Sequence, residues 1–223
     1  MQESALSRYE ALKCKRDPFL RRARECAELT IPALMPPEGH SDATMLPEPY
    51  QGLGARAVVS LASRLMVAMY PPGKPSFKLD IPPEVRIQNG DMSVNKDIEQ
   101  GLILSEQLIQ AEIERKERRP VTNLVLQYLI VTGNALEMMM PDNTMRVFRL
   151  DQFVVSRDMQ GRVREIITEE YLSPESLPEQ IKSMVTAEDY SADRVQLLTH
   201  TMLLNDGTYK SYQEVNKEKV PEI

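Results

Sequence analysis

The sequence has 223 residues, of which 42% are hydrophobic and 5% aromatic, and its formal net charge is −6 at pH 7. This composition excludes a globally disordered chain, and the acidic balance argues against a protein that coats DNA through a basic surface, because such binding depends on neutralising phosphates. Two cysteines are too few for a disulfide framework, no secretory leader is recognisable and no run of 18 apolar residues could span a membrane, so we expect free thiols in a reducing, cytosolic compartment.

The N-terminal residues predict two short helices. The first runs from Ser4 to Arg16, and the pair Asp17-Pro18 is a restart signal, because aspartate caps helix N-termini and proline suits the first helical position. The second runs from about Pro18 to Leu29. Its inward side is expected to hold Phe19, Ala23, Cys26 and Ala27, and both Cys14 and Cys26 are interpreted as small buried hydrophobic residues.

A proline-rich stretch from Thr30 to Tyr50 has no periodicity and predicts an extended loop, on a surface or against another chain. The segment that follows, from Gly52 to Pro72, is the helix around which the chain is organised. Its apolar residues recur at helical spacing and predict a core face made of Val58, Leu61, Ala62, Leu65, Met66 and Met69.

The opposite face of the same helix is polar, with Arg56, Ser60, Ser63 and Arg64. Two arginines among small residues make a flat strip that permits close approach, and arginine suits bidentate pairing with a carboxylate on another chain. We therefore expect this strip near a subunit boundary. The alternative is that both arginines are merely solvated, since most exposed charges contribute little.

The rest of the N-terminal part predicts one short strand and two further helices. Phe77 to Ile81 alternates like a strand, Pro82 to Met92 reads as a loop, and Ser93 to Lys116 is the longest helix, with a solvated, mixed-charge end. Pro120 to Thr132 is apolar nearly all round, which predicts a buried helix, and Gly133-Asn134 ends it.

From Ala135 onward the hydrophobic period changes to two, which predicts strands. These are Leu136 to Met140, Met145 to Leu150, Phe153 to Ser156 and Arg162 to Tyr171, then a helix over Pro174 to Val185 and a hairpin of Val195 to Leu204 with Thr208 to Glu214. Helices followed by an antiparallel meander define the α+β class. The expected division is a helical part over 1–134 and an antiparallel β part over 135–223.

Catalytic and cofactor motifs were sought in the sequence. Gly52-Leu-Gly54 lacks a third glycine and a preceding strand, and Gly73-Lys74 is followed by proline rather than serine or threonine. His40 and His200 have no cysteine or second histidine at ligand spacing. The sequence therefore predicts no catalytic residue, no cofactor and no metal site.

Several blocks, taken in order, resemble one family. They are Tyr9-Glu-Ala-Leu-Lys13, Arg21 to Ala27, Thr30-Ile-Pro-Ala-Leu34, Tyr50 to Arg56, Leu61 to Met66, Tyr70-Pro71, Val131 to Ala135, Arg149-Leu150, Val154 to Asp158 and Gly161-Arg-Val163. The ordered set is similar to podovirus portal proteins, also called head-to-tail connectors, and covers nearly the whole chain. Phe77 stands near the place where members often have tryptophan, and portal chains of this type are more than twice this long, so the resemblance implies an N-terminal portion, mostly the outer wing.

The resemblance implies a homo-oligomeric ring, typically a dodecamer, at one vertex of the virion capsid, assembled in the host cytoplasm. Such a ring would contact capsid and scaffolding proteins, dock the terminase, hold tail adaptor proteins and let double-stranded DNA pass without sequence-specific binding. Two other functions remain open: a soluble α+β adaptor that binds a partner through Arg56 and Arg64, and a nucleic-acid-processing accessory enzyme, which the missing metal and phosphate motifs disfavour.

Overall fold

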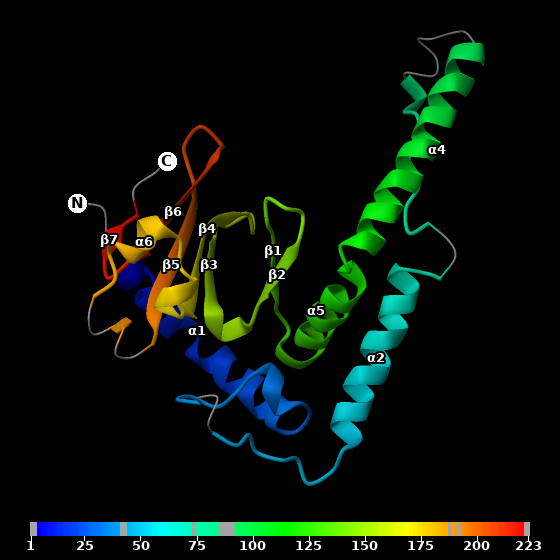
Figure 1. Ribbon diagram of the computed structural model, residues 1–223. Coiled ribbons are helices and arrows are strands. Elements are labelled where there is room, and N and C mark those ends of the chain that lie inside the picture. Colours follow the sequence, from blue (N-terminus) through cyan, green and yellow to red (C-terminus); the bar gives the residue numbers. More distant parts are fainter. Residues whose placement is uncertain are drawn as a thin grey trace.

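One long helix, α1 (Ala5–Glu28), crosses beneath the sheet and extends past it toward the other helices (Figure 1). The computed structural model describes residues 4–40, 44–72, 75–84, 92–186, 189–190 and 193–220. Ser4 caps α1, because its hydroxyl accepts the backbone N–H of Ser7 at 3.2 Å. The predicted restart at Pro18 is wrong, since α1 runs through this proline without a break.

Packing along its whole length explains why α1 stays continuous. Its first half buries Ala5, Tyr9 and Leu12 against the sheet, whereas its second half contributes to another cluster. A proline inside a helix costs about 3 kcal/mol, which burial of both halves can offset. Pro18 itself lies on the exposed side, so its ring meets no packed neighbour.

The inward face of the second half consists of Leu20, Ala23 and Ala27, at helical spacing. Phe19 is 63% exposed and Cys26 is also exposed, so the prediction that they point inward is wrong. Cys14 is likewise exposed rather than buried, and both cysteines are free. In one continuous helix, the position of each residue around the axis is fixed relative to all the others. Cys14, Phe19 and Cys26 therefore lie outside the side of α1 that packs against the core.

The other helices stand to one side of the sheet (Figure 1). Their bounds are α2 (Leu53–Met69), α4 (Met92–Arg115) and α5 (Arg118–Thr132), and short helical turns occur at Pro32–Leu34, Leu150–Gln152, Pro174–Ser176 and Glu179–Lys182. The predicted helix over Pro174 to Val185 is thus only two separate turns. Helix α5 is less buried than predicted, because Leu124 and Leu129 are 37% and 44% exposed.

The predicted strand from Phe77 to Ile81 does not form. This segment is extended but lies along α4, where the backbone N–H of Leu79 donates to Glu106 at 2.5 Å. The backbone N–H of Leu79 is therefore hydrogen-bonded to the side chain of Glu106 and not to a neighbouring strand. The predicted loop over Pro82 to Met92 lies mostly outside the described residues, since 85–91 are not among them.

The C-terminal part contains two antiparallel sheets, as the α+β prediction requires, and that class is confirmed. The hairpin pairs β1 (Leu136–Met139) with β2 (Met145–Phe148). The larger sheet has the order β3-β4-β5-β6-β7, with β3 (Phe153–Arg157), β4 (Val163–Leu172), β5 (Val195–Leu203), β6 (Tyr209–Val215) and β7 (Glu218–Lys219). Sequential order with antiparallel pairing makes it a meander.

The main hydrophobic core joins helices to strands across residue 134. Leu20 of α1, Val58 of α2 and Tyr128 of α5 pack with Phe148 and Phe153 from the β part. Gly54 lets α2 approach the end of α1, because a Cβ there would lie 2.5 Å from the carbonyl oxygen of Leu29. The core thereby fixes where α2 begins, while the rest of α2 runs outward along α5.

Candidate subunit interface

Helix α2 lies at the edge of the molecule and is covered mainly by α5. Val58 and Ala62 face this neighbour and are buried, and Met66 is half-buried. Leu61, Leu65 and Met69 are 46%, 39% and 49% exposed. The predicted core face is therefore wrong for these three residues in the single chain, because its apolar arc is wider than the one face that α5 covers.

The polar strip of α2 is exposed to solvent. Arg56, Ser60, Ser63 and Arg64 all lie on the uncovered side of the helix. Within the described part of the chain, neither arginine pairs with a carboxylate, and α2 itself contains no acidic residue. The strip is thus cationic in a protein whose net charge is −6.

Helix α4 projects from the body beyond α5, as Figure 1 shows. None of its described side chains, from Lys96 to Arg115, is fully buried. Ile103, Leu104 and Leu108 are 51%, 61% and 72% exposed. Its contacts with its own chain include the segment before it, where Ser76 and Leu79 bond to its side chains.

Exposed aliphatic residues gather on these three helices rather than occurring singly. They are Leu53, Val59, Leu61, Leu65, Val67 and Met69 on α2, Ile103, Leu104, Leu108 and Ile109 on α4, and Leu124 and Leu129 on α5. Scattered exposed apolar residues need no explanation, but a contiguous apolar surface with a polar rim marks an interaction site. The helical side of the molecule is therefore the candidate interface.

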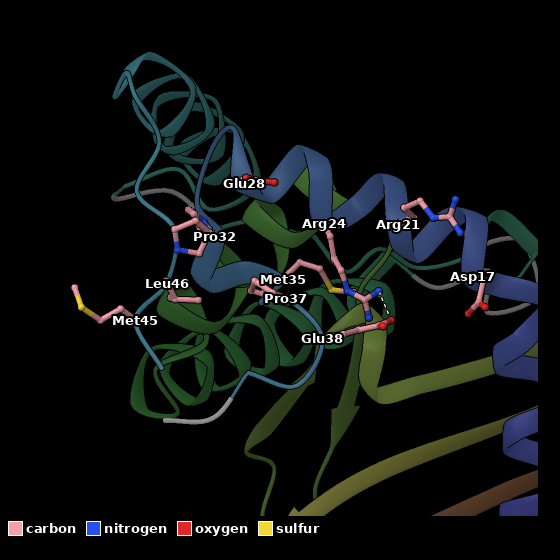
Figure 2. Close-up of a pocket in the computed structure, with 11 residues that line it drawn as sticks. Asp17, Arg21, Arg24, Glu28, Pro32, Met35, Pro37, Glu38, Met45 and Leu46 are labelled. Atoms are coloured by element: carbon pink, nitrogen blue, oxygen red, sulfur yellow. Dashed lines mark hydrogen bonds and ion pairs between the residues drawn. The ribbon is translucent and has the colours of Figure 1, made fainter. Parts of the chain in front are cut away.

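Apart from this helical surface, the molecule has a recess between α1 and the proline-rich loop (Figure 2). The cavity has a volume of about 770 Å³ and is lined by Arg21 and Arg24 of α1. Arg24 points toward the loop and pairs with Glu38 at 2.5 Å, whereas Arg21 extends along α1 toward Asp17. Met45 lines the outer edge of the cavity and is 88% exposed. In its described residues, 30–40 and 44–50, the loop is irregular apart from one helical turn, so this ion pair holds only part of it.

Between α1 and the sheet lies a buried polar layer that sequence reasoning missed. Glu214 on β6 is 1% exposed and accepts the backbone N–H groups of Ala5 and Leu6 at 2.9 and 3.3 Å. Arg8 donates to Glu165 on β4 at 2.5 Å. These contacts anchor the first turn of α1, where unpaired N–H groups and the helix dipole favour a carboxylate.

His200 on β5 joins this layer. Its Nδ1 and Nε2 lie 2.9 Å from Tyr212 Oη and 3.2 Å from a Glu165 oxygen. Burial lowers the pKa of His200, an effect that Glu165 opposes. Burial would raise the pKa of Glu165, but hydrogen bonds and charge from Arg8 and His200 bring it below its ordinary value. Because an ionised carboxylate only accepts, Nε2 carries the proton and Nδ1 accepts from Tyr212.

The strand register brings this layer together, and no local motif marks it. Ile167 lies opposite His200, which lies opposite Tyr212. The described ranges hold no group of three or more histidine, cysteine, aspartate or glutamate side chains that could bind a metal ion. The same ranges hold no helix that is long and apolar enough to cross a membrane.

The structure sets an exposed apolar surface on helices beside an antiparallel meander, and surfaces of this kind mark interaction sites. The family model described as bacteriophage head to tail connecting protein matches residues 2–219. The chain therefore belongs to the head-to-tail connecting, or portal, protein family, and the resemblance read from the sequence is confirmed.

Individual relatives agree with this assignment. The chain is 33% identical over 229 residues to the portal protein of Enterobacteria phage T3 and 33% identical over 230 residues to that of Escherichia phage T7, in each case across 98% of this chain and 42% of the relative. It is 26% identical to the portal protein of Enterobacteria phage SP6, across 93% of this chain and 41% of the relative. The chain thus spans less than half the length of these relatives, each of which is named a portal protein.

Proposed function

We propose that the chain acts as a portal subunit: copies form a closed ring at one capsid vertex, through which viral DNA is packaged and ejected. Family membership supports this role, and the observation that carries it is the uncovered apolar surface of α2 and α4 with the cationic strip on α2. A ring needs heterologous contacts, in which each subunit presents two different patches. The helical side supplies surface of the kind that such contacts bury.

The polar strip of α2 lies at the subunit boundary in this proposal. Arg56 and Arg64 are exposed, and neither has a carboxylate partner among the described residues. A neighbouring subunit would supply carboxylates for both. Leu61 and Leu65, next to the strip, would then be covered by the neighbour rather than by their own chain.

The remaining partners follow from the position of such a ring. It contacts capsid and scaffolding proteins during assembly in the host cytoplasm, docks the terminase during packaging and holds tail adaptor proteins in the finished virion. Double-stranded DNA passes without being held, which suits a protein with a net charge of −6. The subunit itself hydrolyses no ATP and cuts no DNA.

Electron microscopy of the full-length protein tests the proposal. Rings with a central hole, most often of twelve copies, are expected. The exposed arginines also suit an adaptor that binds one partner, and a monodisperse monomer at high concentration would favour that function instead. Nuclease or ATPase turnover that is lost in a point mutant of this chain would contradict the non-enzymatic role.

A further inference from the structure

Helix α4 carries an exposed stripe that no part of the described chain covers. Gly101, Leu104, Leu108 and Ala111 follow one another at spacings of three, four and three residues, and all four are exposed. Such spacing aligns residues along a single side of a helix. The stripe therefore presents two large leucines in the middle and a small residue at each end.

Helix α2 presents an exposed stripe with the same order of small and large residues. Ala57, Leu61, Leu65 and Ala68 are all exposed and lie along one side of the helix, beside the face that packs on α5. Here too, two leucines four residues apart stand between two small residues. Four residues rise about 6 Å along a helix, so the leucine pairs of the two stripes match in spacing whether the helices run parallel or antiparallel.

The two helices carry net charges of opposite sign, and Arg64 on α2 and Asp97 and Glu112 on α4 flank the stripes. Helix α2 contains two arginines, Arg56 and Arg64, and no carboxylate. Helix α4 contains five carboxylates and two cations. Of the carboxylates, Asp97 and Glu112 flank the stripe, and Glu112 also pairs with Arg115, whereas Glu99 and Glu106 lie on the opposite side of the helix. Packing α2 against α2, or α4 against α4, would bring like charges together, which is costly, whereas α2 against α4 brings opposite charges together.

We propose that the α2 stripe of one subunit packs against the α4 stripe of the next copy of this chain. This inference rests on the proposed ring function and names the two surfaces that meet. When each subunit uses its α2 stripe on one neighbour and its α4 stripe on the other, the contact is heterologous and propagates around a ring instead of closing after two subunits. The small residues let the backbones approach, the leucines interdigitate, and Arg64 flanks the seam toward the acidic helix.

Site-directed disulfide cross-linking of the full-length protein tests this contact. In a full-length background from which every cysteine has been removed, Cys14 and Cys26 included, one cysteine replaces Leu61 or Leu65 and a second replaces Leu104 or Leu108. After oxidation, we expect a ladder of covalent oligomers for at least one pairing and none for any single-cysteine variant. The matched control pairs Leu61→Cys with Ile109→Cys, because Ile109 is 43% exposed but lies about 100° from Leu108 around the α4 axis.

Rings that give no ladder, or that cross-link equally well through Ile109→Cys, would overturn the contact and leave the portal function standing. A wild-type protein that forms no ring would overturn the portal function instead. A Leu→Cys variant can fail to form rings although its monomer melts at the normal temperature. If Ile109→Cys still forms rings, that failure to assemble supports the contact.

A second measurement identifies what covers the stripe. In the Leu61→Cys variant, we expect a maleimide to label the thiol in dissociated subunits and labelling to be lost in the ring. Protection in both states would show that another part of the same polypeptide covers α2, and labelling in both would show that nothing does. Either result would contradict the inference.

Discussion

The buried carboxylate of Glu214 accepts the backbone N–H of Ala5 at 2.9 Å, which ties the first turn of α1 to a strand 209 residues later. Leu6 donates to the same side chain. Helix N-termini leave N–H groups without partners, and this carboxylate satisfies two of them in a place where water is excluded. The contact therefore joins the first helix, α1, to strand β6 of the larger sheet.

Replacing Glu214 with alanine should destabilise the protein by about 2 kcal/mol or more, because two buried N–H groups lose their acceptor. Urea unfolding followed by circular dichroism measures the change. Glu218→Ala is the control, since Glu218 is exposed on the next strand and its loss should shift stability by less than about 0.5 kcal/mol. Equal midpoints for the two variants would contradict this role of Glu214.

Acidification should weaken the packing of α1 on the sheet in two stages. The pKa values of both His200 and Glu165 are lowered in the folded state, so each group contributes stability above its unfolded value that is lost as pH falls through its folded value. The loss begins below 6.5 for His200 and below 4.5 for Glu165. In His200→Gln, the difference in unfolding free energy between neutrality and about pH 5 should therefore shrink. An unchanged difference in this variant would show that other groups cause the pH dependence.

Gly54 and Gly101 should respond in opposite directions to alanine. A Cβ at Gly54 would lie 2.5 Å from a backbone oxygen, so α2 must shift, and we expect a loss of about 1–3 kcal/mol. A Cβ at Gly101 meets nothing within 4 Å, so Gly101→Ala should stabilise α4 by about 0.5–1 kcal/mol. Thermal melting of the monomer measures both, and a neutral Gly54→Ala would mean that α2 is not held where the structure places it.

Much of the fold could be predicted from the sequence, because its signals are local. Strand alternation located β1 to β6 within one or two residues, since a period of two reports one buried face directly. Pro18 misled the prediction because its local cost is outweighed by packing that only the folded chain supplies. His200 and Glu165 could not be paired in advance, since their contact depends on strand register.

The candidate interface on α2 could be predicted from the sequence only in part. The apolar stripe of α2 was visible as a pattern, but periodicity does not say what covers an apolar face. Val58 and Ala62 are covered by the chain itself, whereas Leu61, Leu65 and Met69 on the same arc are exposed. A sequence predicts that such residues seek burial, and only the arrangement of neighbouring helices separates a core from a surface for assembly.

Charge reversal on the polar strip should separate folding from assembly. Arg56→Glu with Arg64→Glu should leave the monomer folded, because both side chains are exposed, but should break the ring, because an unpaired charge at a buried boundary costs a few kcal/mol in each repeated contact. Light scattering and circular dichroism report the two properties. Arg162→Glu with Arg164→Glu is the matched control on exposed positions of the β part and should keep the ring. Normal rings from the α2 double variant would remove Arg56 and Arg64 from the boundary.

A density map of the assembled full-length protein, detailed enough to show side chains along α2, tests the central claim most directly. The account predicts a closed ring in which the next subunit covers Leu61 and Leu65 and places carboxylates beside Arg56 and Arg64. A ring in which α2 faces solvent, or is covered by its own polypeptide, would contradict it.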